Sequence, residues 1–190
     1  MTRSSARTFK SGSDWCDFFE AEAKKESERA LPIIAVAVLD EGLAALLRGR
    51  LLPCPTSDDP LFEGPYAPLA TFSTKIDFAF RLGLISAGVA ASLHLIRKIR
   101  NDFAHDISGC SFSQPGVKNR VRELTRLNNV ARPKRRAQFP AGVFGDYQTS
   151  VSWLIFWIWH LVDATPSMCP ECGHIKHRSS QKRKPAETRA

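Results

Sequence analysis

Residues Leu93–His105 read LHLIRKIRNDFAH, and this stretch decides the fold class of the chain. Its apolar members Leu93, Ile96, Ile99 and Phe103 recur at steps of three and four residues. That spacing places them on one face of an α-helix. The stretch therefore predicts a helix that buries one side against a core.

Helices of the same kind are predicted on both sides of this stretch. Ser86 can cap the helix that contains residues 93–105, and Ser13 can cap the first helix of the chain. Gly83 can end the helix expected at residues 71–82. The other helices are expected at residues 13–30, 31–52, 71–82, 115–128 and 147–164. No convincing alternation of apolar and polar residues predicts a β-strand.

The sequence thus predicts an all-α bundle of five to six helices. This single domain is expected to span residues 13–164, between a flexible N-terminus (1–12) and a basic, polar tail (165–190). In two of the helices the pattern also predicts which side chains face inward. They are Phe72, Ile76, Ala79 and Phe80 in the first, and Trp153, Phe156, Trp157 and Leu161 in the second.

Charge is distributed unevenly along the chain, whose formal net charge is +8. Residues 1–96 carry 10 Lys/Arg against 12 Asp/Glu, and residues 97–190 carry 17 against 7, so the second half holds all the excess. This asymmetry favours an anionic partner, with RNA, DNA or an acidic protein surface as candidates. The alternative is a basic tail that is simply solvated.

Several features indicate a cytoplasmic protein that does not enter a membrane. The first ten residues are polar and lack the apolar run of a secretory signal. The longest apolar stretch, at residues 151–162, is shorter than the roughly 20 residues that span a bilayer. The five cysteines are an odd number without framework spacing, which indicates reduced thiols or metal ligands rather than disulfides.

Two blocks of the sequence resemble the mannitol operon repressor family. Residues 61–76 read LFEGPYAPLATFSTKI and residues 80–85 read FRLGLI, and the resemblance continues through residues 96–105. It implies an α-helical transcriptional regulator. No short helix pair presents a polar recognition helix, so contact with a specific DNA sequence is not expected. The resemblance therefore favours a regulator that acts through a protein partner or as a homodimer.

A second resemblance is to the HEPN superfamily, whose signature is an arginine, a polar residue and then a histidine at a helix end. Arg100, Asn101 and His105 match this pattern. The resemblance implies a metal-independent ribonuclease of a toxin or defence type. His105 would move a proton at the RNA 2′-hydroxyl or leaving oxygen, Arg100 would stabilise charge on the phosphate, and Asn101 would orient the base or the imidazole.

The same three residues also suit a structural role at a helix end. Arg100 can pair with Asp77 or another acid, and Asn101 can bond to His105 one turn later. Five residues along a straight helix place Arg100 and His105 about 140° apart. The ribonuclease hypothesis therefore needs a bent helix end, or a homodimer that brings two copies of the motif together.

The tail contains a Cys-x2-Cys knuckle followed by two histidines. The candidate zinc ligands are Cys169, Cys172, His174 and His177. Zinc takes four such ligands in a tetrahedron, although ligand pairs usually lie a dozen or more residues apart. The alternative is a disordered tail with two reactive thiols.

Other basic residues are candidate contacts to nucleic-acid phosphates. They are Arg97, Lys98, Arg132, Lys134, Arg135 and Arg136. Such contacts add affinity without sequence preference, and a purely solubilising role is the equal alternative. Tryptophans in the last helix can stack on bases, but their helical spacing favours a place in the core.

Overall fold

The structure is a computed structural model, and it describes residues 12–56, 58–106, 109–128, 139–166 and 168. These residues form six α-helices and no β-strand, which confirms the predicted all-α bundle. The helices are α1 (Gly12–Lys25), α2 (Leu31–Arg50), α3 (Phe72–Arg81), α4 (Ala87–His105), α5 (Pro115–Leu127) and α6 (Val143–Ala164). None of these helices is long and apolar enough to cross a bilayer.

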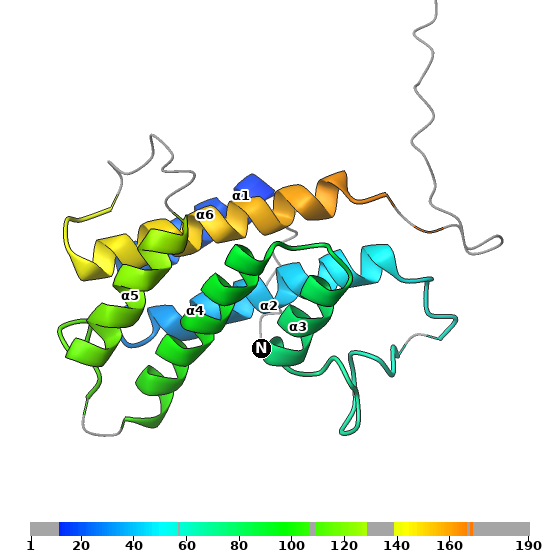
Figure 1. Cartoon of the computed structure of the whole chain (residues 1–190), viewed down its shortest axis with the longest axis horizontal. Coiled ribbons are helices and arrows are strands. Elements are labelled where there is room, and N and C mark those ends of the chain that lie inside the picture. Colours follow the sequence, from blue (N-terminus) through cyan, green and yellow to red (C-terminus); the bar gives the residue numbers. More distant parts are fainter. Residues whose placement is uncertain (1–11, 57, 107–108, 129–138, 167, 169–190) are drawn as a thin grey trace, which may run out of the picture.

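Helix α2 lies at the centre of the bundle and packs against α1, α3, α4 and α6. Figure 1 shows α1 and α6 together along one side of α2, and α3 and α4 along the other. Helix α5 contacts both α4 and α6. Gly42 brings α2 close to α6, because a Cβ at this position would lie 2.9 Å from Cγ2 of Ile158.

The stripe predicted on the helix of residues 93–105 is confirmed. Leu93, Ile96, Ile99 and Phe103 are each fully buried in the core. Ser86 caps α4, as expected, by accepting a hydrogen bond from the Val89 N–H at 3.3 Å. The rings of Phe103 and Phe112 lie 4.9 Å apart, and Phe112 in turn contacts Tyr147. An aromatic cluster therefore lies directly behind the last turns of α4.

The predicted bounds of the first helix were wrong at both ends. Helix α1 begins at Gly12, so Ser13 lies inside it rather than at the cap, and it ends at Lys25 rather than at residue 30. After the helix, the Ser27 hydroxyl accepts a hydrogen bond from the Ala30 N–H at 3.2 Å. Such a local side-chain bond competes with helical pairing and produces a turn before α2.

Helix α6 begins at Val143, one turn before the predicted start at Tyr147. Gly145, which precedes the predicted start of the helix, lies inside it. A Cβ at this position would lie 1.7 Å from the carbonyl oxygen of Pro140, so the chain before α6 packs against the bare Cα. The glycine here allows close packing and does not break the helix.

The predicted inward faces are correct only in part. Phe72, Ile76 and Ala79 are buried on α3, but Phe80 is exposed. On α6 the fully buried residues are Tyr147, Val151, Leu154, Ile155 and Ile158. Phe156 is 51% exposed, and Trp153, Trp157 and Leu161 are only partly buried. Because α6 is apolar on most sides, its sequence pattern does not select the face that packs.

Candidate functional site

The last turn of α4 carries Arg100, Asn101 and His105. Arg100 is half-buried, and its Nη1 donates a hydrogen bond to Oδ1 of Asn101 at 3.2 Å. His105 is exposed and is the last residue of the helix. The helix stays regular to its end, and no hydrogen bond or ion pair joins Arg100 to His105 within the described residues. One copy of the chain therefore does not bring the two side chains together.

The sequence suggested two pairings in this turn, Arg100 with an acid such as Asp77 and Asn101 with His105. The structure has other partners for these residues. Asp77 lies 3.0 Å from Nε2 of His94, and that contact joins α3 to α4 without Arg100. Oδ1 of Asn101 accepts a hydrogen bond from Arg100 rather than from His105. The Nε atom of Arg100 is buried without a hydrogen-bond partner. Arg100 is thus bonded to a neighbour on the same helix rather than to a carboxylate.

Polar contacts between α4 and α5 complete this end of the bundle. Asp102 forms an ion pair with Arg120, and each side chain is about one-third exposed. The buried Cys110 thiol donates to Oε1 of Gln114 at 3.4 Å. Desolvation raises the pKa of this thiol, and the carboxylates of Asp102 and Asp106 raise it further. Cys110 is therefore kept as a thiol at neutral pH and is a poor nucleophile.

The remaining candidates from the sequence fall into two groups. Arg97 is half-buried on α4 with its Nε atom unpartnered, and Lys98 is exposed beside it. The other basic candidates and all four zinc ligands lie outside the described residues. They are Arg132, Lys134, Arg135, Arg136, Cys169, Cys172, His174 and His177. Their predicted roles therefore stay predictions.

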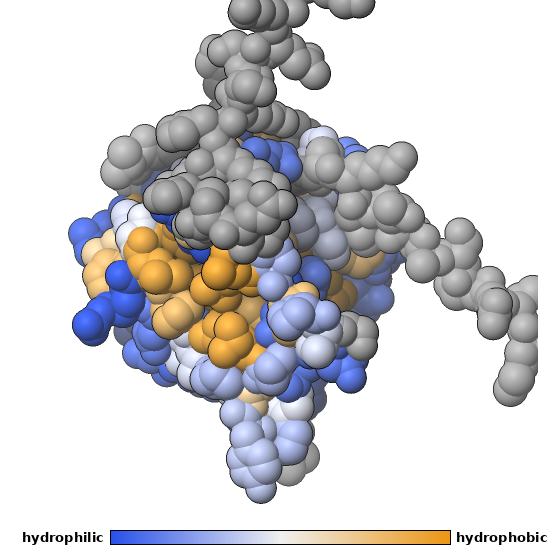
Figure 2. All heavy atoms as spheres, turned by 90° about the vertical axis from the view of Figure 1, so that its right-hand side faces the viewer, coloured by the Kyte–Doolittle hydropathy of each residue, from blue (hydrophilic) through white to orange (hydrophobic). Residues whose placement is uncertain are grey.

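The most distinctive surface of the molecule lies between residues 52 and 82. Six of the eight large apolar side chains exposed in the described chain come from this segment. We call them the 52–82 surface: Leu52, Leu61, Tyr66, Phe78, Phe80 and Leu82. Figure 2 shows apolar side chains gathered on the end of the molecule that this segment occupies in Figure 1. Exposed large apolar side chains are candidates for contact with a protein partner.

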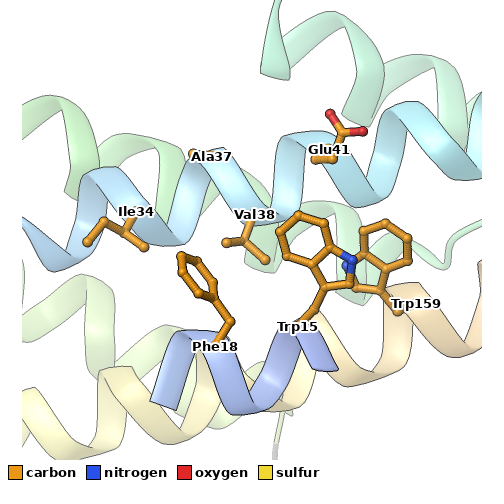
Figure 3. Close-up of a pocket in the computed structure, with 7 residues that line it drawn as sticks. All are labelled: Trp15, Phe18, Ile34, Ala37, Val38, Glu41 and Trp159. Atoms are coloured by element: carbon orange, nitrogen blue, oxygen red, sulfur yellow. The ribbon is translucent and has the colours of Figure 1, made fainter. Parts of the chain in front are cut away.

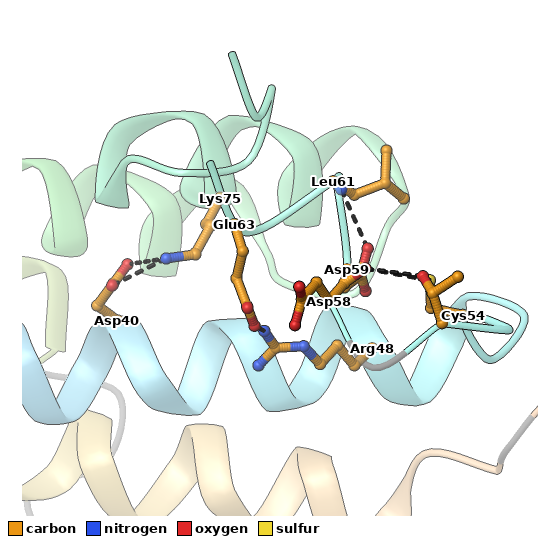
Figure 4. Close-up of polar contacts among 9 residues, drawn as sticks. Asp40, Arg48, Cys54, Asp58, Asp59, Leu61, Glu63 and Lys75 are labelled. Carbon is orange, nitrogen blue, oxygen red and sulfur yellow. Dashed lines mark hydrogen bonds and ion pairs between the residues drawn. The ribbon is translucent and has the colours of Figure 1, made fainter. Parts of the chain in front are cut away.

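Polar contacts between α2, α3 and the loop before α3 form the frame of this surface (Figure 4). Lys75 of α3 is only 5% exposed, and its Nζ lies 2.8 Å from each carboxylate oxygen of Asp40 on α2. Arg48 pairs with Glu63 at 3.4 Å, and its guanidinium lies 4.4 Å from the centre of the Phe62 ring. These contacts hold both α3 and the loop before it against α2.

The loop of residues 51–71 has its own buried anchors. Phe62 and Leu69 point into the core, while the Leu69 N–H donates to the Leu61 carbonyl at 2.8 Å. Thr71 caps α3 by accepting a hydrogen bond from the Thr74 N–H. A hollow of about 650 Å³ lies between the end of α2 and this loop, and Leu52 and Leu61 are among the residues that line it. The part of the loop from Leu61 to Thr71 therefore presents its apolar groups from a defined conformation.

A second apolar hollow, of about 710 Å³, lies between α1, α2 and α6 (Figure 3). Trp15 of α1 and Trp159 of α6 stack there with ring centres 4.9 Å apart, and Phe18 meets Trp15 edge-on. Ile34 and Glu41 of α2 face them. Because the two indoles stack on each other, their partly buried rings contribute to packing between α1 and α6.

The sequence pattern did not identify the 52–82 surface. Phe80 was assigned to the core, and Phe78 and Leu82 were not assigned a face. A signal was nevertheless present, because Phe78 and Leu82 are one turn apart and lie away from the Ile76 face of the helix. When an amphipathic helix has apolar residues outside its buried stripe, packing against the core does not cover all of its apolar surface.

No family model and no curated protein sequence matches the chain. Among solved structures, the chain is similar to one in the X-ray structure of the MtlR–HPr complex from Escherichia coli. The two share 20% sequence identity with a TM-score of 0.57, and the match covers 76% of this chain and 98% of the other. The bundle therefore has an MtlR-like fold.

Proposed function

We propose that this chain is a transcriptional regulator of the mannitol-repressor type that acts by binding a protein partner, and that this partner is HPr. The observation that carries the proposal is an MtlR-like fold in which most of the exposed large apolar side chains gather between residues 52 and 82. In the similar solved structure, MtlR is in a complex with HPr. Direct reading of a DNA sequence is not part of the proposed mechanism.

The position of the exposed apolar groups supports the 52–82 surface as the docking site. Phe78 lies on α3, and Leu82 lies one turn later, directly after the end of the helix. Their side chains are 38% and 44% exposed, respectively. Removal of apolar surface from water is the dominant favourable term in most protein–protein association. The pair Lys75–Asp40 and the anchors of the loop fix these groups before binding, which lowers the entropy cost of association.

Titration calorimetry of the full chain with purified HPr tests the proposal. We expect saturable 1:1 binding by the native chain, and at least a tenfold loss of affinity in the double variant Phe78→Ser/Leu82→Ser. Phe156→Ser is the matched control, since Phe156 is 51% exposed on α6 and lies outside the 52–82 surface. The control is expected to bind HPr within twofold of the native chain.

Two results would contradict the proposal. Absence of HPr binding by the folded native chain would remove HPr as the partner. Binding that survives the double variant but is lost in Phe156→Ser would keep the partner and move the docking site to α6. Circular dichroism of all three proteins shows whether a loss of binding comes from a loss of folding.

A further inference from the structure

A basic hollow of about 500 Å³ lies between α5 and the start of α6. One wall is a row of cations on α5, at Lys118, Arg122 and Arg126. Residues at four-residue spacing share one face of a helix, and each step rises about 6 Å along its axis. The three side chains therefore form a line rather than a closed cup.

Two of these three cations have no carboxylate partner among the described residues. Arg126 is neutralised by Glu123, whose two oxygens lie 2.7 and 2.8 Å from its guanidinium. Within the described residues, the Arg122 side chain donates only to the neutral Oδ1 of Asn119, at 3.0 Å. No ion pair or side-chain hydrogen bond joins Lys118 to any other described residue. Lys118 and Arg122 thus present positive charge that the described part of the chain does not neutralise.

The opposite wall is also suited to an anion. Gly142 and Val143 line the hollow, and they form the start of the 22-residue helix α6. Gly142 supplies no side-chain cap, so the first N–H groups of α6 have no side-chain acceptor there. Among the described residues that line the hollow, Asp146 is the one carboxylate, so this lining keeps an excess of positive charge.

We propose that this hollow binds two successive phosphates of the backbone of a single-stranded nucleic acid, with Lys118 and Arg122 as the main contacts. A row of cations matches successive phosphates of a strand better than it matches one isolated anion. The contacts are to the backbone, so binding is expected to show little sequence preference. The site is on the opposite side of α4 from α3 and is independent of the HPr hypothesis.

Fluorescence anisotropy of the full chain with a labelled single-stranded RNA, and with a DNA of the same sequence, tests this proposal. The double variant Lys118→Glu/Arg122→Glu is expected to weaken binding at least tenfold. The slope of log K against log salt concentration is expected to shrink by about 1.4, since each single-strand phosphate contact contributes about 0.7. Asp146→Asn is expected to tighten binding, because it removes the one negative group of the lining.

The matched control is Lys24→Glu/Lys25→Glu, which makes the same change in net charge at two exposed lysines of α1. It is expected to change the affinity by less than threefold. Equal losses in the two double variants would overturn the proposal, because net charge alone would then explain binding. It is also overturned if the native chain binds neither RNA nor DNA, or if millimolar inorganic phosphate displaces both, since the hollow would then hold a small anion only.

Discussion

The 52–82 surface and the last turn of α4 differ in the kind of side chain that they expose to solvent. The first exposes apolar side chains, and its polar groups, such as the Lys75–Asp40 pair, are partnered beneath them. The second exposes His105 but keeps the Arg100 guanidinium half-buried against Asn101. Only the first region exposes large apolar side chains, whose contact with water is unfavourable in the isolated chain. A bound partner would remove these side chains from water.

This difference separates the two functions that the sequence raised. A protein-docking role needs apolar groups held outside the core, and the 52–82 surface has them. A ribonuclease needs an acid–base group and a phosphate ligand that converge on one point. Within one copy of the chain, α4 carries Arg100 and His105 in different directions. This difference favours protein binding at the 52–82 surface over RNA cleavage at the end of α4.

The largest effect is expected behind the turn of α4. Phe103 is fully buried and contacts Phe112, so Phe103→Ala leaves a cavity beneath the turn. We expect the free energy of unfolding to fall by about 3–5 kcal/mol in urea denaturation. A fall below about 1 kcal/mol would show that the core does not support this end of the helix.

The frame of the 52–82 surface is expected to show the next largest effect. Asp40→Asn leaves the ammonium group of Lys75, which is 5% exposed, without its counter-charge. Because Asp40 itself is one-third exposed, we expect a loss of about 2–3 kcal/mol rather than the full cost of a buried ion.

Glu63→Gln is the control for Asp40→Asn, since it breaks the exposed pair with Arg48. Exposed pairs contribute little, and we expect a change of at most about 1 kcal/mol by the same urea measurement. Equal losses in the two variants would contradict the assignment of Lys75–Asp40 as the main polar support of α3.

The aromatic cluster behind α4 predicts a dependence of stability on alkaline pH. Burial raises the pKa of Tyr147 above its ordinary value of 10.0, so the folded chain keeps this phenol protonated. Above pH 10 the unfolded chain loses the proton and the folded chain does not. The free energy of unfolding should therefore fall with rising pH, by about 1.4 kcal/mol per pH unit from this one group.

Tyr147→Phe should remove that contribution, while Tyr66→Phe should not, since Tyr66 is 95% exposed. At neutral pH, Tyr147→Phe is expected to be close to neutral, because the buried hydroxyl has no hydrogen-bond partner. Urea denaturation between pH 8 and pH 11.5 measures both effects. An unchanged pH slope in Tyr147→Phe would contradict the burial of this phenol.

The smallest effect is expected at His105, which is exposed and forms no hydrogen bond or ion pair with the described residues. His105→Ala should change the free energy of unfolding by less than about 0.5 kcal/mol. Native chain and variant should also affect cell growth and total RNA equally when expressed side by side. Growth arrest and RNA decay with the native chain alone would support the ribonuclease hypothesis.

The sequence predicted the fold class and most helices because the apolar spacing is strong where one face alone is buried. The stripe from Leu93 to Phe103 is the clearest case. Prediction failed at α6, where apolar residues surround the helix and no period selects a face. It also failed at Gly145, because the close approach of Pro140 depends on tertiary structure that no local pattern contains.

For the candidate sites, the sequence identified residues by type but not by exposure. Arg100, Asn101 and His105 were singled out by a short pattern, and the pattern could not show that a regular helix holds them apart. Lys118 and Arg122 lie in the helix predicted at residues 115–128, but the pattern did not single them out, because the α6 wall that faces them lies more than a dozen residues later. Exposure of Phe80 was missed for the same reason, since burial depends on which neighbours pack around a helix.

Hydrogen–deuterium exchange of the full chain with and without HPr tests the central claim most directly, because it reports on both regions in one experiment. The account predicts slower exchange on HPr binding in peptides that cover residues 59–82, and no change in those that cover residues 95–106. Slower exchange at residues 95–106, with no change at residues 59–82, would contradict it.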